Sequence, residues 1–376
     1  MRSDITILAA LAAAGVTSAL PHISRRQDAN PFEGRQLFVN PTYSESLEVT
    51  KQSFSGNATN AGKVQFIQNE VGTFVWVSNI DSLANIDAAI EAARSAQEST
   101  GTEQIVGLVL YNLPDRDCSA GESSGELTVA EGGVDRYKTE YVDVYASKVL
   151  EASDLQFAII MEPDAVANMI TGKDIPLCSS AADAQRECIA YAIDKLQADN
   201  VHLYLDAANG GWLGSADMIT AAATEFANII GQTSGSIRGF STNVSNYNPF
   251  SAETPDPVTD GSQSYDESHY VSNLAPALEG AGLPSRFIID QSRVALPGAR
   301  SDWGEWCNVE PAGFGQPATT QTDNANVDSI VWAKPGGESD GECGMAGAPA
   351  AGSWFDAFAQ MLIVNAHPDV KSVAVE

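Results

Sequence analysis

Phe157-Ala158-Ile159-Ile160-Met161-Glu162-Pro163-Asp164-Ala165 is the stretch that decides the fold. Its apolar run suits a strand of a parallel sheet, which is buried on both faces, and Pro163 ends that strand because proline donates no ladder hydrogen bond. Asp164 is therefore expected at the carboxyl end of a strand, where α/β barrels carry their catalytic groups. Asp164 also precedes a helical pattern over 165–170, so it is equally a candidate helix N-cap.

Short apolar runs alternate with helical patterns along the rest of the chain. The apolar runs predict strands over 73–77, 105–111, 156–161, 201–205, 237–240, 286–290 and 328–332. The helical patterns cover 86–97, 135–151, 181–197, 216–230, 265–280 and 354–365. This alternation implies right-handed βαβ units in one parallel sheet, and no glycine-rich nucleotide-binding motif follows any strand. We predict a single-domain α/β protein built on a seven-stranded parallel barrel.

The N-terminal segment reads as an export signal. Residues 1–19 contain Arg2, a short apolar run and the small residues Thr17-Ser18-Ala19, which is typical of a secretory signal peptide. Arg25-Arg26 follows as a candidate dibasic processing site, so residues 20–26 are a candidate propeptide and 27–376 the barrel domain. The sequence therefore predicts a secreted, extracellular protein.

The chain is strongly acidic, with a formal net charge of −29. Such a surface repels phosphate backbones and anionic lipids, which argues against nucleic acid or a membrane as a partner. A neutral ligand meets no such repulsion. For a secreted protein of this composition we expect a monomer.

Five cysteines occur in a chain for which export permits disulfides. Cys188 lies on the apolar face of a predicted helix and is the expected free thiol. The bridges would then be Cys118–Cys178 and Cys307–Cys343. A metal site is the competing interpretation, but the sequence has no Cys-x-x-Cys pair and only four histidines. We predict neither a metal nor a cofactor.

Carboxylates recur at the ends of the predicted strands and should converge on one cleft. They follow four different strands, at Asp115 and Asp117, Glu162 and Asp164, Asp206, and Glu338 and Asp340. Glu162 is interpreted as structural. Trp76, Trp212 and Trp306 lie at strand ends or in loops, where indole rings can stack on sugars, whereas Trp332 and Trp354 fit a core. Paired carboxylates with tryptophans indicate glycosidic cleavage, which needs a protonated acid and a second group.

Two of these stretches resemble the signatures of glycoside hydrolase family 6, the fungal and bacterial cellulases. They are Tyr111-Asn112-Leu113-Pro114-Asp115-Arg116-Asp117-Cys118, followed by Ser123-Ser124-Gly125-Glu126, and Ile160-Met161-Glu162-Pro163-Asp164. The resemblance continues through Tyr204-Leu205-Asp206-Ala207, Gly211-Trp212-Leu213-Gly214, Thr242-Asn243-Val244-Ser245-Asn246-Tyr247-Asn248, Trp303-Gly304-Glu305-Trp306-Cys307-Asn308 and Lys334-Pro335-Gly336-Gly337. It covers the chain from about Asn40 to the end.

The resemblance implies a distorted seven-stranded parallel barrel that hydrolyses β-1,4-glucosidic bonds of cellulose with inversion. By motif position, Asp164 matches the catalytic acid and Asp117 the aspartate that raises its pKa and stabilises the transition state. Tyr111 matches the tyrosine that helps distort the sugar, Ser123 a serine that holds the attacking water, and Asp340 the debated base. Arg116 matches a partner of the carboxylates. The resemblance implies sugar contacts at Trp76, Asp206, Trp212, Asn246, Trp306 and Lys334.

Departures from the family pattern concern the mode of attack. Asp206-Ala207-Ala208-Asn209 and Gly214-Ser215 replace a sugar contact and a distal tryptophan found in chain-end-cleaving members. Cys343 follows Asp340 almost at once, whereas the tunnel-forming members have a longer excursion there. In the tunnel-forming members that excursion covers the site. The shorter loop here predicts an open cleft, and therefore an endoglucanase. The alternatives are a cellobiohydrolase that acts from non-reducing ends and, more remotely, a non-catalytic secreted glucan-binding protein.

Overall fold

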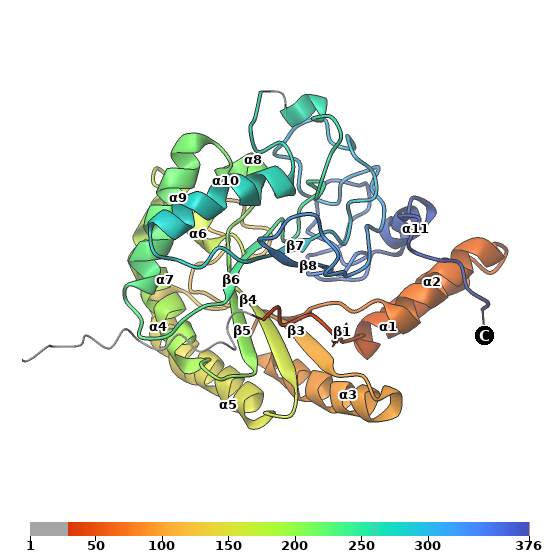
Figure 1. The fold of residues 1–376 in the computed structure, drawn as a ribbon, viewed down its shortest axis with the longest axis horizontal. Helices are drawn as coiled ribbons and strands as arrows, with labels where there is room; N and C mark the ends of the chain where they lie inside the picture. The colour runs from red at the N-terminus through yellow and green to blue at the C-terminus, as the bar shows by residue number, and fades with distance from the viewer. Residues whose placement is uncertain (1–28, 260, 376) are drawn as a thin grey trace, which may run out of the picture. The chain divides into compact units, whose positions relative to one another are not determined.

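Parallel strands form a single curled sheet in the computed structural model, which describes residues 29–259 and 261–375 (Figure 1). The predicted signal peptide and candidate propeptide lie outside these residues. The strands are β1 (Gln36–Leu37), β2 (Val75–Val77), β3 (Gln104–Leu110), β4 (Gln156–Met161), β5 (Val201–Asp206), β6 (Gly239–Thr242), β7 (Phe287–Asp290) and β8 (Val327–Val331). Neighbours pair in the order β1-β3-β4-β5-β6-β7-β8, with β2 also pairing β3.

β1 and β2 share one position in the sheet. β1 pairs with the start of β3, at Gln104 and Ile105, and β2 pairs with its end, from Leu108 to Leu110. The sheet is therefore seven strands wide, although eight segments build it. Among the described strands no ladder joins β8 to β2, and a hydrogen bond of 3.0 Å from the Phe74 N–H to the Trp332 carbonyl spans that seam. The predicted distorted seven-stranded barrel is confirmed as a curled half-barrel.

All seven predicted strands are present, with ends that differ by at most two residues. The largest difference is at β6, which begins at Gly239 rather than 237 and ends at Thr242. Ser241 and Thr242 are fully buried despite being polar, so an apolar run was a poor guide to the end of this strand. β1, with only two residues, was not predicted.

Helices follow most strands and cover the outer face of the sheet (Figure 1). Their bounds are α1 (Pro41–Ser53), α2 (Ala58–Glu70), α3 (Ala84–Thr100), α4 (Gly133–Arg136), α5 (Asp143–Glu151), α6 (Ala165–Thr171), α7 (Pro176–Lys195), α8 (Gly210–Leu213), α9 (Ala216–Ile230), α10 (Glu267–Gly280) and α11 (Asp356–Val364). Single turns of 3₁₀ helix occur at η1 (Asp81–Leu83), η2 (Val129–Glu131) and η4 (Pro257–Thr259), and a π-helical turn, η3 (Tyr137–Val142), joins α4 to α5. The six predicted helices are present, and the helical pattern over 165–170 corresponds to α6, whereas α1, α2 and α8 were not predicted.

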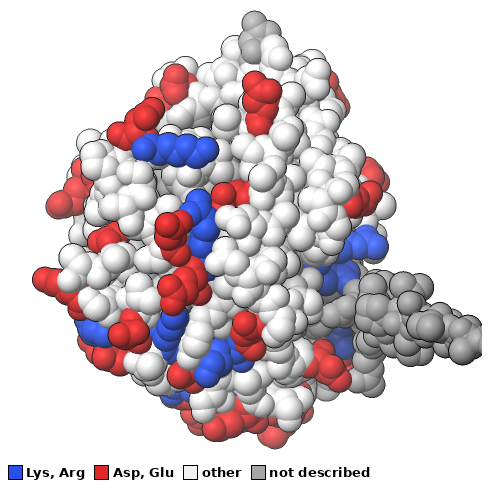
Figure 2. Space-filling model, turned by 90° about the vertical axis from the view of Figure 1, so that its left-hand side faces the viewer, with Lys and Arg blue, Asp and Glu red and all other residues white. Residues whose placement is uncertain are grey.

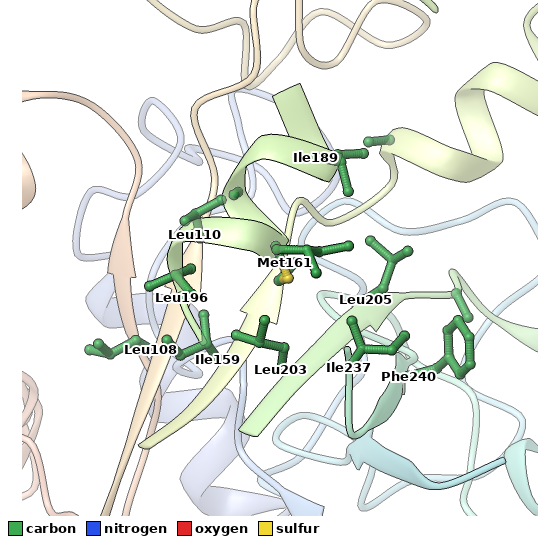
Figure 3. Close-up of a cluster of buried hydrophobic side chains, with 14 of the residues drawn as sticks. Leu108, Leu110, Ile159, Met161, Ile189, Leu196, Leu203, Leu205, Ile237 and Phe240 are labelled. Carbon is green, nitrogen blue, oxygen red and sulfur yellow. The ribbon is translucent and has the colours of Figure 1, made fainter. Parts of the chain in front are cut away.

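The alternation of side chains along the strands creates two apolar layers. Leu108, Ile159 and Leu203 point outward and pack in one cluster with helix residues such as Ile189 and Leu196 (Figure 3). On the inner face a second cluster fills the curl of the sheet, with Val109, Ile160, Tyr204, Ile288 and Val331. Burial on both faces explains why these strands read as continuous apolar runs.

A third apolar cluster joins the two ends of the described chain. Leu47 of α1, Val64 of α2 and Leu362 of α11 belong to it, and Trp332 lies fully buried within it. Trp354 packs against the same cluster. Trp332 is therefore a core residue, as predicted, and Trp354 is partly buried against the core.

The cysteine prediction is confirmed. Cys118 pairs with Cys178 and Cys307 with Cys343, while Cys188 is a buried free thiol of α7. The first bridge ties the loop after β3 to the start of α7. The second ties the loop after β7 to the loop after β8.

Cations on the helical face lie beside acidic residues (Figure 2). Lys138 pairs with Glu187 and Arg186 with Glu225, so the few basic groups here are locally neutralised. A partly exposed pair such as Lys138–Glu187 contributes only about 0–1 kcal/mol to the free energy of unfolding. None of the helices in the described ranges is long and apolar enough to span a bilayer.

Gly107 of β3 provides a test of the inner packing. A Cβ atom at this position would lie 2.6–2.8 Å from atoms of the Phe74 ring, which is fully buried. We expect Gly107→Ala to lower the free energy of unfolding by about 1–3 kcal/mol, because overpacking displaces a buried ring. Urea denaturation measures the change. Gly56→Ala is the control, since a Cβ there meets nothing within 4 Å; equal stabilities of the two variants would contradict the close approach.

Candidate active site

The carboxyl ends of the strands surround a cleft of about 750 Å³. Eleven of the twelve catalytic and sugar-binding residues predicted from the sequence line it: Trp76, Tyr111, Arg116, Asp117, Ser123, Asp164, Trp212, Asn246, Trp306, Lys334 and Asp340. Asp206 does not line the cleft. Its side chain lies behind Asp164, with 2% of the residue exposed.

Strained backbone is concentrated around this cleft. Asp117, Glu162, Asp164, Ala208 and Ser245 all have positive φ angles, which residues other than glycine seldom adopt. They follow β3, β4, β5 and β6. Such conformations cost about 1–3 kcal/mol each and are typical of functional sites, where the surrounding structure holds them in place.

Asp164 is not a side-chain N-cap. It precedes α6, but its φ is +67° and its side chain accepts no hydrogen bond from the first turn of that helix. Among the described residues, none donates a hydrogen bond to its carboxyl group. The side chain is partly exposed at the cleft wall, free to meet a ligand. The catalytic interpretation therefore fits the geometry better than the capping interpretation.

Asp206 holds the backbone at Asp164. Its Oδ2 accepts the N–H of Asp164 at 2.9 Å and the N–H of Ala208 at 3.0 Å, while its Oδ1 accepts the Ser241 hydroxyl at 3.1 Å. Burial raises the pKa of Asp206 to about 7, although these three donors act in the opposite direction. Asp206 thus holds the backbone of Asp164 and also places a negative charge near the Asp164 carboxyl group.

The pKa of Asp164 is raised well above its ordinary value. Burial in the wall makes the largest contribution, followed by the charge of Asp206 and then that of Asp117. Because Asp206 has three donors that favour its ionised form and Asp164 has none, the neutral form is favoured more strongly at Asp164 than at Asp206. The site therefore contains one carboxylic acid that retains its proton beside carboxylates that lose theirs more readily.

Asp117 faces the same cleft from the loop after β3. Its Oδ2 accepts the Ser123 N–H at 2.6 Å. Burial raises its pKa, while the Ser123 N–H and the Arg116 charge oppose that rise. Arg116 lies over the Tyr111 ring at 4.3 Å and donates to the Ser123 carbonyl at 2.8 Å. One guanidinium thus joins the start and the end of this loop.

Aromatic rings lie directly beside these carboxyls. Trp76 of β2 contacts Tyr111 edge-on, with ring centroids 5.3 Å apart, and its Nε1 donates to the Ala333 carbonyl at 2.8 Å. The Lys334 ammonium lies 5.7 Å from the centre of the Trp76 ring. Trp212 of α8 is half-buried, and its Nε1 donates to the Thr171 hydroxyl at 3.0 Å. These rings offer apolar faces with polar groups at their edges, which suits sugar rings.

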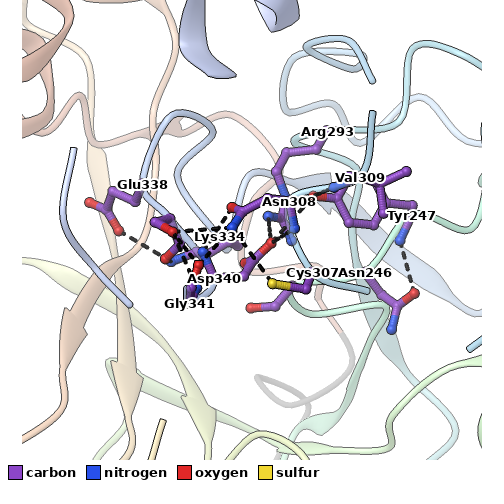
Figure 4. Close-up of polar contacts among 12 residues, drawn as sticks. Asn246, Tyr247, Arg293, Cys307, Asn308, Val309, Lys334, Glu338, Asp340 and Gly341 are labelled. Atoms are coloured by element: carbon purple, nitrogen blue, oxygen red, sulfur yellow. Dashed lines mark hydrogen bonds and ion pairs between the residues drawn. The ribbon is translucent and has the colours of Figure 1, made fainter. Parts of the chain in front are cut away.

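Asp340 also lines the cleft and lies in a network of donors (Figure 4). Its Oδ2 accepts from Arg293 at 2.6 Å, from the Asn308 N–H at 2.9 Å and from the Tyr247 hydroxyl at 3.3 Å. Arg293 is almost fully buried, so this is a desolvated ion pair. Only the other oxygen, Oδ1, remains for a water or a substrate.

Trp303 and Glu338 are among the cleft residues to which the sequence analysis gave no site role. Trp303 lines the cleft, and its Nε1 donates to Asn248 at 3.1 Å. Glu338 also lines it and pairs with Lys334 at 3.6 Å. Trp303 belongs to the same loop motif as Trp306, so the sequence signal for a second ring in that loop was present. Glu338 was recognised only as one of a run of strand-end carboxylates.

The arrangement is suited to acid-catalysed cleavage of a neutral polymer. A protonated carboxyl, nearby carboxylates and half-buried indoles surround the cleft, and no group of three or more potential metal ligands occurs among the residues that the structure describes. Proton donation combined with stabilisation of developing positive charge is the chemistry of glycoside hydrolysis.

Comparison with known proteins agrees with this chemistry. The family model for Glycosyl hydrolases family 6 matches residues 32–366. The solved structure of an endoglucanase from Humicola insolens aligns with a TM-score of 0.89 at 60% identity, covering 91% of this chain and 100% of that one. A probable exoglucanase of Podospora anserina is also 60% identical, over 99% of this chain and 85% of its own length. A 1,4-beta-D-glucan cellobiohydrolase of the same fungus is 54% identical, over 98% of this chain and 91% of its own length. The chain belongs to glycosyl hydrolase family 6, whose cellulases hydrolyse β-1,4-glucan with inversion.

Proposed function

We propose that this protein is a secreted, monomeric β-1,4-glucanase that cleaves cellulose chains internally. The observation that carries the proposal is the short loop after β8, between Lys334 and Trp354. Relatives named as endoglucanases and as cellobiohydrolases match about equally well, so the mode of action is argued from this loop.

The loop after β8 is short and fastened along its length. Only two residues separate Asp340 from Cys343, and Cys343 is bridged to Cys307. At the base of the loop, the Ser339 N–H donates to the Ser353 carbonyl at 2.9 Å. A loop closed on itself and fixed to its neighbour cannot extend across the cleft as a long roof does. The middle of a glucan chain can therefore enter from the side.

The cleft has one point where its two walls meet. A Cβ atom on Gly341 would lie 3.2 Å from the Cβ of Glu122, so the Ser123 loop rests against the loop after β8. No hydrogen bond or ion pair joins loop 119–124 to loop 339–352 in the described structure. A contact made by one exposed side chain opens at little cost, which favours side entry. The same contact supports the alternative, a cellobiohydrolase in which the walls stay together around a chain end.

We propose that Asp164 is the general acid. Its raised pKa, its unbonded carboxyl group and its place in the cleft wall support this role. Asp117 stabilises the positive charge that develops on the sugar, and Tyr111 with Arg116 holds that part of the loop. Trp76, Trp212 and Trp306 stack on glucose rings, with Lys334 and Asn246 at their edges. Ser123 helps to hold the attacking water.

Asp340 is the proposed base, and its geometry limits how it acts. Three donors occupy Oδ2, so only Oδ1 is left to accept a proton from water. Inverting enzymes accommodate a water between acid and base, typically with the carboxyls about 6.5–9.5 Å apart.

Removal of the acid should separate catalysis from binding. We expect Asp164→Asn to lower kcat by about 10²–10⁴-fold, because the leaving oxygen is no longer protonated. Cello-oligosaccharide affinity, followed by tryptophan fluorescence, should change little. Lys173→Gln, a substitution outside the cleft, is the control. Unchanged turnover in Asp164→Asn would reject the assignment, and wild-type binding without any hydrolysis would favour a non-catalytic glucan-binding protein.

The charge of Asp206 should set the upper pH limit of activity. Asp164 acts only while protonated, so activity falls as pH rises through its raised pKa. Asp206→Asn removes a neighbouring negative charge and lowers that pKa, so the high-pH limb of kcat/KM should move to lower pH. Asp183→Asn, at a fully exposed side chain of α7, is the matched control and should leave the limb in place. A limb that stays fixed in Asp206→Asn would contradict the proposed coupling.

The mode of attack is tested by the viscosity of carboxymethylcellulose, measured against the reducing ends released. An endoglucanase should give a steep fall in viscosity with few new ends, because internal cuts shorten chains most. Slow viscosity loss with cellobiose as the main early product would support the cellobiohydrolase alternative. Asp164→Asn in the same assay corrects for any contaminating activity.

A further inference from the structure

The hydrogen-bond ladder between β3 and β4 ends just before the catalytic loop. Its last rung is the N–H of Glu162, which donates to the Leu110 carbonyl at 2.8 Å. At Glu162 the backbone turns away from the strand with φ of +49°. The next amides along the β3 side, those of Asn112 and Leu113, therefore have no backbone partner on β4.

The carboxylate of Glu162 continues the ladder in place of the backbone. Its Oε1 accepts the N–H of Asn112 at 3.2 Å, and its Oε2 accepts the N–H of Leu113 at 3.3 Å. All three residues are completely buried, so neither amide has water as an alternative partner. One side chain thus ties two consecutive residues of the loop after β3 to the end of β4.

The π-helical turn η3 supports this arrangement from behind. The Tyr137 hydroxyl donates to Glu162 Oε1 at 2.8 Å, and the Tyr141 hydroxyl accepts the N–H of Tyr111 at 3.1 Å. Three successive amides, from Tyr111 to Leu113, are therefore held by buried side chains. π-Helical turns occur frequently at functional sites.

Burial raises the pKa of Glu162 to about 7, although the Tyr137 hydroxyl and the two amides act against that rise. The titratable groups that interact with it come from the surrounding elements. They are Tyr137 and Tyr141 of η3, Tyr145 of α5, Cys188 of α7, and Tyr111 and Arg116 of the catalytic loop. A buried carboxyl is costly to keep, and a leucine of similar size would avoid that cost. What a leucine cannot do is accept hydrogen bonds from the loop.

We propose that Glu162 is a positioning residue for the glycosidic cleavage. Its carboxylate fixes the loop that carries Tyr111, Arg116 and Asp117 relative to Asp164, which lies two residues away across the rigid Pro163. Glu162 does not line the cleft, so it acts through these groups and not on the substrate. The proposal rests on the family activity and is independent of whether cleavage is internal or from chain ends.

Glu162→Gln is the decisive variant, because it keeps the size of the side chain but replaces one acceptor oxygen with an NH₂ group. An NH₂ group cannot accept an N–H, so either the Asn112 or the Leu113 amide loses its partner, and we expect the loop to shift away from Asp164. We expect kcat on cellotetraose to fall about 10- to 100-fold, as small displacements of catalytic groups do, with KM nearly unchanged. The high-pH limb of kcat/KM should also move to lower pH, because Asp117 no longer raises the pKa of Asp164 as strongly.

Tyr137→Phe is the matched control. It removes a hydrogen bond from the same buried carboxylate but leaves both loop amides bound, so kcat and the limb should remain close to wild type. Glu162→Asp keeps the carboxylate but shortens the side chain, so the carboxylate no longer reaches the loop amides. It should therefore lose activity as Glu162→Gln does. Thermal unfolding of each variant shows how much protein is folded under the assay conditions.

A purely structural role predicts a different pattern. Glu162→Gln would then lower the melting temperature, while kcat per folded molecule and the pH limb would match wild type, and this result would overturn the proposal. An equal loss of kcat in Tyr137→Phe would also overturn it, because the loop amides would not be the cause. Should Glu162→Gln fail to fold, Glu162→Asp decides in its place: a lower kcat with a shifted high-pH limb supports the proposal, and wild-type values for both reject it.

Discussion

Hydrogen bonds from backbone amides to carboxylates at the strand ends are the interaction on which the cleft depends. Parallel strands stop pairing where their loops diverge, and the amides just beyond the last rung are buried without partners. Glu162 after β4, Asp206 at the end of β5 and Asp290 at the end of β7 each accept such amides from neighbouring loops. A hydrogen bond to a charged group contributes about 1.5–3 kcal/mol, and an unsatisfied buried amide costs a similar amount. The catalytic loops are therefore held by side chains of the sheet itself.

The same principle explains why Asp164 differs chemically from its neighbours. Asp290 accepts the amides of Ser245, Ser292, Ala333 and Lys334. Burial raises the pKa of Asp290, and these donors oppose that rise because they favour the ionised form. Asp164 receives no donor in the described structure and stands next to Asp206, so its neutral form is favoured. All of these residues are aspartates, so their different roles follow from the direction in which each carboxyl group points. Asp206 and Asp290 point toward backbone amides, whereas Asp164 points into the cleft.

The sequence was sufficient to predict the sheet, because each central strand is buried on both faces and reads as an apolar run. The cysteine pairing was equally accessible once Cys188 was recognised as a core residue. β1 could not be predicted, since a two-residue strand leaves no periodicity. The roles of Glu162 and Asp206 as anchors were also hidden, because the sequence places carboxylates at strand ends without showing which amides they reach. The family resemblance suggested a sugar contact for Asp206, whereas its carboxylate is directed to the backbone of Asp164 and Ala208.

The seam between β8 and β2 has a mechanical consequence for the cleft. Trp76 stands on one side of it and Lys334 on the other, and the edges are joined by isolated hydrogen bonds, such as those from Phe74 to Trp332 and from Trp76 to Ala333. A closed barrel would resist any change of width with a whole ladder. Here only isolated hydrogen bonds join the two edges, so the seam offers less resistance to a change of cleft width than the paired strands β3, β4 and β5 do.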